Sequence, residues 1–222
     1  MYRRYAIYFT PGGALAKTGA AWLGWDIATG KAVPHPPIEG LNIAALTKRP
    51  RKYGLHATIK PPMVLADGTT AEAFVKAASS LAKNIDPVAL DALHITQIGR
   101  FLALTAGGDT PQLDALAAQF VEALDPFRAP PTPEEIARRR HRTLTASQER
   151  NLARWGYPNV IEDFRFHITL TGPIKNPEEV LAKVTAHFAP VLPSPFIITN
   201  LIVAGEDADG MFHALTRLPL GR

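Results

Sequence analysis

Two stretches of similar sequence, YGLHATIKPP (residues 53–62) and FRFHITLTGP (residues 164–173), decide the predicted fold. When His56 and His167 are aligned, the apolar positions around them coincide, and so do Thr58 and Thr169 two residues further on. Side chains of a strand alternate between its two faces, so each stretch predicts a strand with one buried and one open face. Their recurrence predicts an internal duplication of roughly 110 residues.

The predicted open faces carry the polar side chains of both stretches. The apolar sets, which we expect to be buried, are Tyr53, Leu55, Ala57 and Ile59 in the first stretch and Phe164, Phe166, Ile168 and Leu170 in the second. The polar sets are His56, Thr58 and Lys60 in the first stretch and Arg165, His167, Thr169 and Thr171 in the second. Each open face therefore offers an imidazole, a hydroxyl and a cation.

This combination fits the cleavage of a phosphodiester. One histidine can take a proton from the attacking oxygen while the other gives one to the leaving oxygen, because an imidazole titrates near neutral pH. Thr58 and Thr169 can donate hydrogen bonds to the non-bridging oxygens, and Lys60 or Arg165 can offset their charge. The two patterns are too similar to tell which histidine is the base and which the acid.

Two further His-x-Thr triplets serve as comparisons. His94-Ile95-Thr96 lies in a predicted strand with poor alternation, and His141-Arg142-Thr143 lies in a basic helical stretch. Neither has the surroundings of the aligned pair, so we assign no function to them.

A metal site is the alternative use of two histidines. Glu162 and Asp163 lie close to His167 in the sequence and could complete a zinc or iron site. The positions patterned around the histidines hold hydroxyls and cations instead, so we expect neither metal nor cofactor. The chain also lacks a Gly-x-Ser-x-Gly elbow, a phosphate-binding loop and a dinucleotide-binding fingerprint.

Composition limits the class of protein further. The chain has 222 residues, no cysteine and a formal charge of +4, which exclude a disulfide framework and a thiolate nucleophile. Two basic clusters, KRPRK (48–52) and RRRHR (138–142), suit anionic partners; we read the second as a solvated face. No apolar run is long enough to cross a bilayer, and the apolar run of the N-terminal stretch is too short for a signal peptide. We expect a cytoplasmic enzyme that does not bind membranes.

The order of predicted elements favours an α+β fold with antiparallel sheets. Strands are expected at 5–10, 53–62, 92–106, 164–173 and 196–220, and helices at 13–26, 38–47, 69–84, 110–124, 133–156 and 176–190. The Pro-rich segment 125–135 suggests one bilobal domain with approximate lobes 1–126 and 132–222 around a central cleft.

The duplicated His-x-Thr strands resemble those of the two-histidine phosphoesterase superfamily, which includes RNA ligase-like cyclic phosphodiesterases. The wording YGLHATIKPP, AAWLGWDIATGK and RWGYPNVIEDFRFHITLTGP is most similar to bacterial phosphonate-metabolism proteins encoded near carbon–phosphorus lyase genes. The resemblance implies metal-independent chemistry at a phosphodiester, often a 2′,3′-cyclic phosphate, with catalytic roles for His56, Thr58, His167 and Thr169. It also implies a small sugar or nucleotide cyclic phosphate as substrate.

Two RNA-directed alternatives stay open. The cleft could bind RNA ends without turnover, or the chain could be a 2′,5′ ligase or an RNA phosphodiesterase, since its basic clusters suit a phosphate backbone. Trp155 and Tyr157 precede the second pattern and are candidates for the cleft mouth, with Tyr157 a candidate for substrate binding. The sequence does not indicate an oligomeric state.

Overall fold

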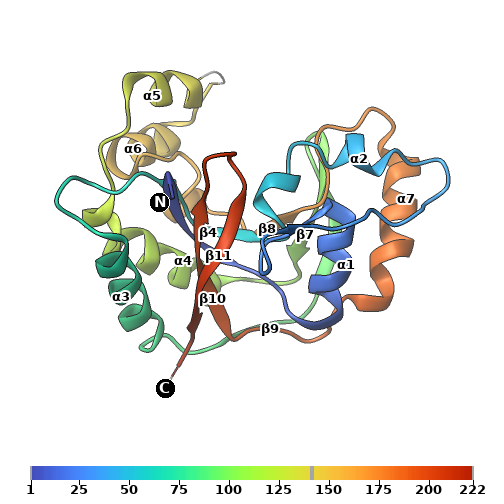
Figure 1. Ribbon diagram of the computed structural model, residues 1–222, viewed down its shortest axis with the longest axis horizontal. Helices are drawn as coiled ribbons and strands as arrows, with labels where there is room; N and C mark the ends of the chain where they lie inside the picture. Colours follow the sequence, from blue (N-terminus) through green and yellow to red (C-terminus); the bar gives the residue numbers. More distant parts are fainter. Residues whose placement is uncertain (1, 141–142, 222) are drawn as a thin grey trace.

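The computed structural model, which describes residues 2–140 and 143–221, has an α+β fold around one seven-stranded sheet (Figure 1). The strand order is β11-β10-β1-β4-β8-β7-β6, and every neighbouring pair is antiparallel. The predicted fold class is therefore confirmed. No helix in the described ranges is long and apolar enough to cross a membrane.

The strands of the main sheet and the α-helices overlap the predicted ranges, but some are much shorter, since only His167–Thr169 of 164–173 is strand and only Ile43–Leu46 of 38–47 is α-helix. The main sheet contains β1 (Arg4–Phe9), β4 (Ala57–Met63), β6 (Leu93–Ile98), β7 (Phe101–Ala106), β8 (His167–Thr169), β10 (Asn200–Glu206) and β11 (Phe212–Pro219). Two short ribbons pair β2 (Trp25–Asp26) with β3 (Lys31–Ala32) and β5 (Val88–Leu90) with β9 (Phe196–Ile198). The α-helices are α1 (Gly13–Leu23), α2 (Ile43–Leu46), α3 (Ala71–Ala82), α4 (Pro111–Ala123), α5 (Pro133–Arg139), α6 (Ala146–Trp155) and α7 (Pro177–Phe188). The 3₁₀ turns are η1 (Arg51–Tyr53), η2 (Asp125–Phe127), η3 (Ile161–Asp163) and η4 (Ala189–Val191).

Local capping chemistry explains where several helices begin. The hydroxyl of Thr70 accepts a hydrogen bond from the Ala73 amide at 3.1 Å, as expected for the N-cap of α3. Thr145 and Gln148 form a capping box that starts α6, and Gly156 ends this helix in the left-handed conformation. The single polar helix predicted over 133–156 is thus two helices, α5 and α6, because Thr145 begins a new one.

Strands from the two halves of the sequence are interleaved in the sheet. β1 and β4 from the first half lie between β10 and β8 from the second, and β7 and β6 from the first half follow β8. Figure 1 shows α3 and α4 at one end of the sheet and α1 and α7 at the other. The division into lobes 1–126 and 132–222 stays a prediction. Strands from both segments belong to the same sheet.

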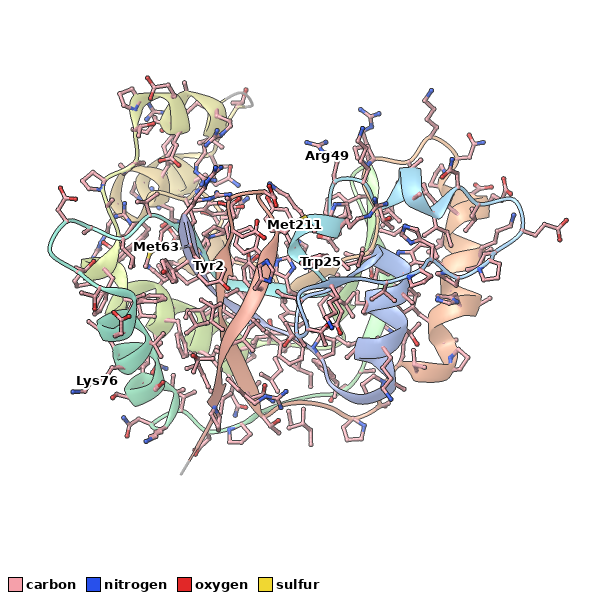
Figure 2. All side chains as sticks on the ribbon, in the orientation of Figure 1. Tyr2, Trp25, Arg49, Met63, Lys76 and Met211 are labelled. Atoms are coloured by element: carbon pink, nitrogen blue, oxygen red, sulfur yellow. The ribbon has the colours of Figure 1, made fainter. Side chains whose placement is uncertain are left out.

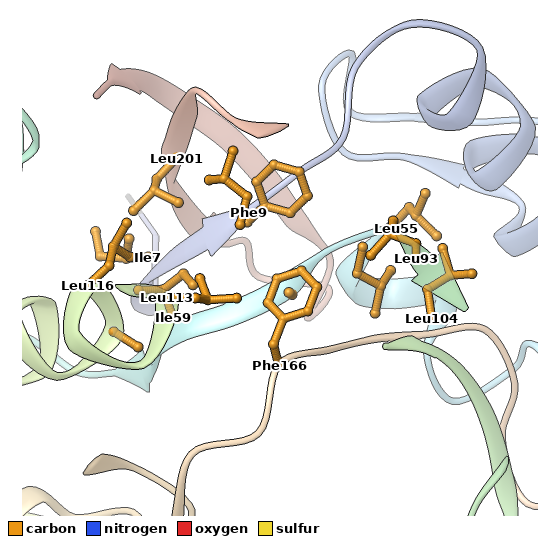
Figure 3. Close-up of a cluster of buried hydrophobic side chains, with 14 of the residues drawn as sticks. Ile7, Phe9, Leu55, Ile59, Leu93, Leu104, Leu113, Leu116, Phe166 and Leu201 are labelled. Carbon is orange, nitrogen blue, oxygen red and sulfur yellow. The ribbon is translucent and has the colours of Figure 1, made fainter. Parts of the chain in front are cut away.

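The main core lies on one face of this sheet. Its side chains include Ile7, Phe9, Ile59, Leu104 and Phe166, which gather between the strands and the helices in Figure 3. Ala57 and Ile168, which alternate with the threonines of the two patterns, are 1% and 0% exposed on this face. The predicted alternation around both histidines is therefore present where the strands are regular.

The first pattern departs from a regular strand before His56. Tyr53 ends the turn η1, and Gly54 follows with φ +66°, where a Cβ atom would lie 2.6 Å from the Cβ of Ile27. The period of two does not extend through this turn, so Tyr53 is only half-buried and does not join the main core. The expectation that Tyr53 is a core residue is wrong for this reason.

Candidate active site

The two histidine–threonine pairs lie on the same face of the sheet. Ala57 of β4 is the register partner of Ile168 of β8, and both are buried in the core. Their chain neighbours point to the opposite face because side chains alternate along a strand. These neighbours are His56, Thr58, His167 and Thr169, the four residues predicted as catalytic. Three of them, His56, Thr58 and Thr169, line a pocket of about 750 Å³, and His167 lies beside Thr169 on the same strand.

Both imidazole rings are oriented by the carbonyl oxygen two residues earlier. Nδ1 of His56 lies 3.0 Å from the oxygen of Gly54, and Nδ1 of His167 lies 2.8 Å from the oxygen of Arg165. A carbonyl oxygen only accepts, so Nδ1 is the protonated nitrogen in each neutral ring. Nε2 of each ring is left for other partners, and that of His56 lies 3.2 Å from the Thr58 hydroxyl.

The two rings differ in their surroundings. The ring of Tyr8 lies 4.0 Å from that of His56, and the ring of Tyr53 lies 5.6 Å away. Burial lowers the pKa of His56 to about 4, against a smaller opposing effect of the hydrogen bond to Gly54, and the nearby His167 lowers the pKa further. His56 is therefore neutral near pH 7 and suited to accept a proton. The aromatic neighbour of His167 is Phe101, at 6.1 Å.

Cationic side chains surround the pocket. Those in its lining are Arg4, Lys48, Arg49, Lys52 and Arg139, and no carboxylate belongs to the lining among the described residues. Three of the five, Lys48, Arg49 and Lys52, come from the cluster KRPRK. Figure 2 shows Arg49 at the upper edge of the molecule, to the right of its centre. Arg51 of the same cluster instead donates to the carbonyl oxygens of Leu23 and Ala44 at 3.0 and 2.7 Å. The cluster therefore contributes positive charge to the pocket lining and also holds the preceding segments together.

Lys60, predicted to bind substrate, does not reach the pocket. Its side chain is buried, its ammonium donates to the carbonyl oxygen of Val121 at 2.9 Å, and Asp125 lies 3.9 Å away. The register of β4 against β1 shifts between Thr58 and Lys60, so an irregularity interrupts the alternation and Lys60 faces α4. The expectation that Lys60 shares the open face is corrected by this shift.

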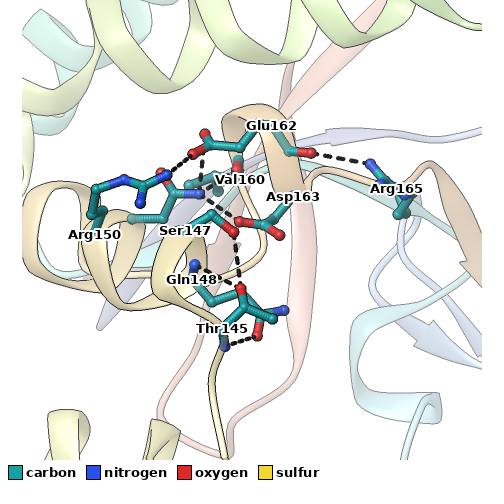
Figure 4. A network of polar contacts seen from close by, with 9 residues as sticks. Thr145, Ser147, Gln148, Arg150, Val160, Glu162, Asp163 and Arg165 are labelled. Atoms are coloured by element: carbon teal, nitrogen blue, oxygen red, sulfur yellow. Dashed lines mark hydrogen bonds and ion pairs between the residues drawn. The ribbon is translucent and has the colours of Figure 1, made fainter.

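Arg165 and Thr171, also predicted to bind substrate, have mainly structural partners. The guanidinium of Arg165 donates to the carbonyl oxygens of Glu162 and Phe164, as Figure 4 shows for Glu162, and it lies outside this pocket. Thr171 belongs to the lining, but its hydroxyl is buried and accepts a hydrogen bond from the Leu102 amide at 3.0 Å. Of the four predicted substrate-binding residues, Tyr157 is the one with an open position in the lining.

The lining also contains residues that were not predicted from the sequence, among them Arg4, Tyr8 and Arg139. Arg4 and Tyr8 belong to β1, and Arg139 ends α5; none lies near the histidine patterns in the chain. The guanidinium of Arg139 lies over the ring of Tyr157 at 4.3 Å, and Arg4 forms an ion pair with Glu206. The basic cluster RRRHR, which contains Arg139, was the signal in the sequence that could have identified this residue. Not every member of the cluster lines the pocket: Arg140 pairs with Glu149 at 2.7 Å, and His141 and Arg142 lie outside the described residues.

The carboxylates considered for a metal site have other partners. Asp163 accepts a hydrogen bond from the Asn151 amide at 3.1 Å, and Glu162 contacts Arg150 at 3.3 Å (Figure 4). Within the described ranges, no group of three or more His, Asp or Glu side chains is arranged to hold a metal ion. The acidic pair therefore tethers the turn before β8 to α6.

A family model with the description "Protein of unknown function (DUF1045)" matches residues 58–213, so the chain belongs to this family. Two curated relatives are each named ribose 1,5-bisphosphate phosphokinase PhnN. That of Janthinobacterium sp. (strain Marseille) is 34% identical over 97% of this chain, and that of Laribacter hongkongensis (strain HLHK9) is 32% identical over 97%. The chain spans about half the length of these relatives, covering 50% and 51% of them.

Solved structures similar to this chain include one described as a phosphoesterase, with 17% identity and a TM-score of 0.49 over 100% of both chains. A structure of E. coli LigT complexed with 3′-AMP has 16% identity and a TM-score of 0.49 over 100% of both chains. The protein TT0787 of Thermus thermophilus has 14% identity and the same TM-score over 99% of both chains.

Proposed function

We propose that this chain is a phosphoesterase that opens a cyclic phosphodiester of a small sugar or nucleotide by acid–base catalysis with His56 and His167. The observation that carries the proposal is the register pair Ala57–Ile168, which directs both histidine–threonine pairs to one face beside a cationic pocket. The activity is proposed to take place in the cytoplasm, which cell fractionation can test.

Each residue of the two pairs has a distinct part in this mechanism. Nε2 of the neutral His56 takes a proton from the attacking water, and Nε2 of a protonated His167 gives one to the leaving oxygen. The ring-opened product is a phosphate monoester. His56 then loses its proton to solvent and His167 takes one up from solvent, which restores both residues for the next turnover. Thr58 and Thr169 donate hydrogen bonds to the non-bridging oxygens. Proton transfer by the two histidines and charge stabilisation by the cationic side chains of the pocket lining, here called the basic rim, are proposed to need no metal ion.

The proposed substrate class draws on the family relationship as well as on the pocket. The two curated relatives are named for a phosphokinase of ribose 1,5-bisphosphate, and this chain is similar to about half of each. That name supports a phosphorylated sugar as the kind of molecule on which the chain acts, and the resemblance to phosphonate-metabolism proteins suggests that this sugar comes from the breakdown of phosphonates. The pocket volume of about 750 Å³ is compatible with a sugar or a single nucleotide.

A substrate panel tests the reaction class. The purified protein is incubated with nucleoside 2′,3′-cyclic phosphates, nucleoside 3′,5′-cyclic phosphates and ribose cyclic phosphates, each with and without a chelator, and phosphate monoesters are detected by ³¹P NMR. We expect ring opening of at least one five-membered cyclic phosphate, unaffected by the chelator. No turnover of any compound, or loss of all turnover with the chelator, would contradict the proposal.

A second candidate function is the binding or processing of RNA ends. Lys48, Arg49 and Lys52 in the pocket lining favour it, because a phosphate backbone is attracted by such a basic rim. Binding of a short single-stranded RNA, measured by fluorescence anisotropy between 50 and 200 mM salt, tests it. Affinity that falls steeply with salt and depends on a 2′,3′-cyclic end supports this candidate, whereas micromolar or tighter binding that ignores salt contradicts it.

A further inference from the structure

The lining of the pocket contains two buried donors that lack hydrogen-bond partners within the described part of the chain, one on β1 and one on α5. Nε of Arg139 and the hydroxyl of Tyr8 are buried, and neither has a hydrogen-bond partner among the described residues. Both side chains belong to the lining of the same pocket. Unpaired buried donors are costly to a protein, so their presence in the lining of one pocket indicates that a bound ligand supplies the acceptors.

The guanidinium of Arg139 is held in place by an aromatic ring instead of a carboxylate. It lies over Tyr157 at 4.3 Å, and the ring keeps the guanidinium plane fixed without neutralising its charge. Burial lowers the pKa of Arg139 against smaller opposing effects of Tyr157 and Glu135. The nearby Arg138 and Arg4 lower this pKa slightly further. Two guanidiniums thus belong to the same pocket lining, and Arg4 has a counter-ion, Glu206, while Arg139 forms no ion pair with any of the described residues.

The charge of the whole pocket exceeds what the reacting group requires. Five cationic side chains line it, and Glu206 neutralises one of them, whereas a cyclic phosphodiester carries a single negative charge. Lys48, Arg49 and Lys52 precede His56 in the chain and line the same pocket, and their charge suffices for the phosphodiester. Arg139 comes from α5, which Figure 1 shows at the upper left of the molecule, whereas α2, close before this basic cluster in the chain, lies at the upper right.

We propose that Arg139, on its Tyr157 platform, forms a second anion subsite that binds an anionic group of the substrate other than the reacting phosphodiester. This inference rests on the proposed function and specifies its substrate class: a cyclic phosphodiester that also carries a phosphate or a carboxylate. A planar guanidinium with several donors suits either group, because both present two oxygens to a pair of N–H groups. The subsite selects substrates and takes no part in proton transfer.

Three matched substrates test the subsite. They are adenosine 2′,3′-cyclic phosphates with a hydroxyl, a phosphate or a carboxylate at the 5′ position. kcat/KM is measured for wild type, for Arg139→Gln and Arg139→Lys, and for the control Arg138→Gln. Arg138 is a suitable control because it lies on the same helix, is strongly exposed and pairs with Glu135 at 3.7 Å.

We expect wild type to prefer a 5′-anionic substrate over the 5′-hydroxyl compound, and the preferred anion identifies phosphate or carboxylate. Arg139→Gln should lower kcat/KM for that substrate by about 10- to 100-fold, the usual effect of losing a charge-assisted hydrogen bond, and leave the 5′-hydroxyl compound nearly unchanged. Arg139→Lys should fall between, and Arg138→Gln should match wild type. Equal turnover of the three substrates by wild type, or an equal loss on all three in Arg139→Gln, would overturn the subsite.

Binding measurements separate this proposal from the proposed reaction. Dissociation constants of the same three compounds are determined by calorimetry with His167→Ala, alone and combined with Arg139→Gln. If no compound is turned over by wild type yet the 5′-anionic one binds more tightly and loses that advantage in Arg139→Gln, the reaction is wrong and the subsite stands. If all three bind equally, the subsite is wrong whatever the turnover.

Discussion

Ala57 and Ile168 lie opposite each other in the register of β4 and β8, both buried in the core. This pairing determines the position of every group proposed to act in the reaction, since a shift of one residue would turn a histidine–threonine pair into the core. It joins two segments that are far apart in the sequence. The duplicated pattern therefore becomes a single site only through the central strand pair of the sheet.

The aromatic surroundings of His56 predict an unusual pH dependence of activity. Because burial lowers the pKa of His56 to about 4, this base stays unprotonated in mildly acidic solution. We expect kcat/KM to decline on the acid side only as pH falls toward about 4. In Tyr8→Leu, which opens the ring contact to water, the acid limb should move toward the ordinary histidine value near 6.5. The control Phe101→Leu, beside His167, should leave that limb in place; a wild-type limb near 6.5 that Tyr8→Leu does not move would contradict this assignment.

The same pKa shift predicts a pH dependence of stability. The folded pKa of His56 is below the unfolded value of about 6.5, so its contribution to the free energy of unfolding is fully present above pH 6.5 and is lost as pH falls toward 4. The loss should amount to about 3 kcal/mol at most. Urea unfolding of wild type and His56→Gln at pH 7.5 and pH 5 measures it. The two proteins should differ in their pH dependence, and parallel behaviour would count against a half-buried His56 that is neutral near pH 7.

Lys60 is expected to matter for stability and not for turnover. Replacing it with alanine leaves the Val121 carbonyl oxygen without its buried donor, which should lower the free energy of unfolding by about 1–3 kcal/mol. kcat/KM should stay within a few-fold of wild type, because the ammonium faces α4 and not the pocket. Denaturant unfolding and steady-state kinetics on the same preparation check both parts. A large loss of kcat with unchanged stability would restore Lys60 as a substrate-binding residue.

Thr169, the last residue of β8, and Thr171, two positions further along the chain, should separate function from structure. Thr169→Val removes a hydroxyl of the proposed site and should lower kcat by about 10- to 100-fold with little change in stability. Thr171→Val removes the acceptor of the Leu102 amide and should cost about 1–2 kcal/mol of stability. Thr171→Ser keeps that acceptor and should behave like wild type. The opposite assignment of the two effects would show that the roles are reversed.

The basic rim should affect substrate capture in a salt-dependent way. Arg49→Ala and Lys52→Ala each remove a charge from the pocket lining, so KM should rise several-fold at low salt and less at high salt. Arg165→Ala is the matched control, since its guanidinium binds the Glu162 and Phe164 carbonyl oxygens outside the pocket. Initial rates at 20 and 500 mM salt test this. An effect of Arg165→Ala on KM as large as that of Arg49→Ala would contradict the assignment of Arg49, but not Arg165, to the pocket lining.

The sequence predicts the direction of side chains correctly where the alternation of the strands is regular. The prediction fails where a turn or a register shift interrupts that alternation. The alternation around His56 and His167 correctly places Ala57 and Ile168 in the core. It fails for Tyr53, which lies beyond the turn at Gly54, and for Lys60, which follows the register shift between β4 and β1. Alternation is recognised from the order of apolar and polar residues. A turn with positive φ or a shifted register changes the direction of the side chains but leaves that order as it is, so the sequence pattern does not reveal either one.

Other parts of the site depend on long-range packing. Tyr8 reaches His56 because β1 pairs with β4, and Arg139 reaches the pocket because α5 lies over Tyr157. Neither residue belongs to a short pattern, so local periodicity has no means of linking it to the histidines. The fold class was predictable, since the order of strands and helices depends mainly on local signals. The interleaving of strands in the sheet was not.

The most direct test of the central claim is the turnover of a 2′,3′-cyclic nucleotide by wild type, His56→Ala, His167→Ala and the double variant, measured side by side. If the two imidazoles act on one phosphorus centre, each single substitution should lower kcat by about 10²- to 10⁴-fold. The double variant should then be hardly slower than the worse single one, because the pair acts as a unit. Near wild-type turnover in either single variant, with the fold intact by circular dichroism, would contradict the account.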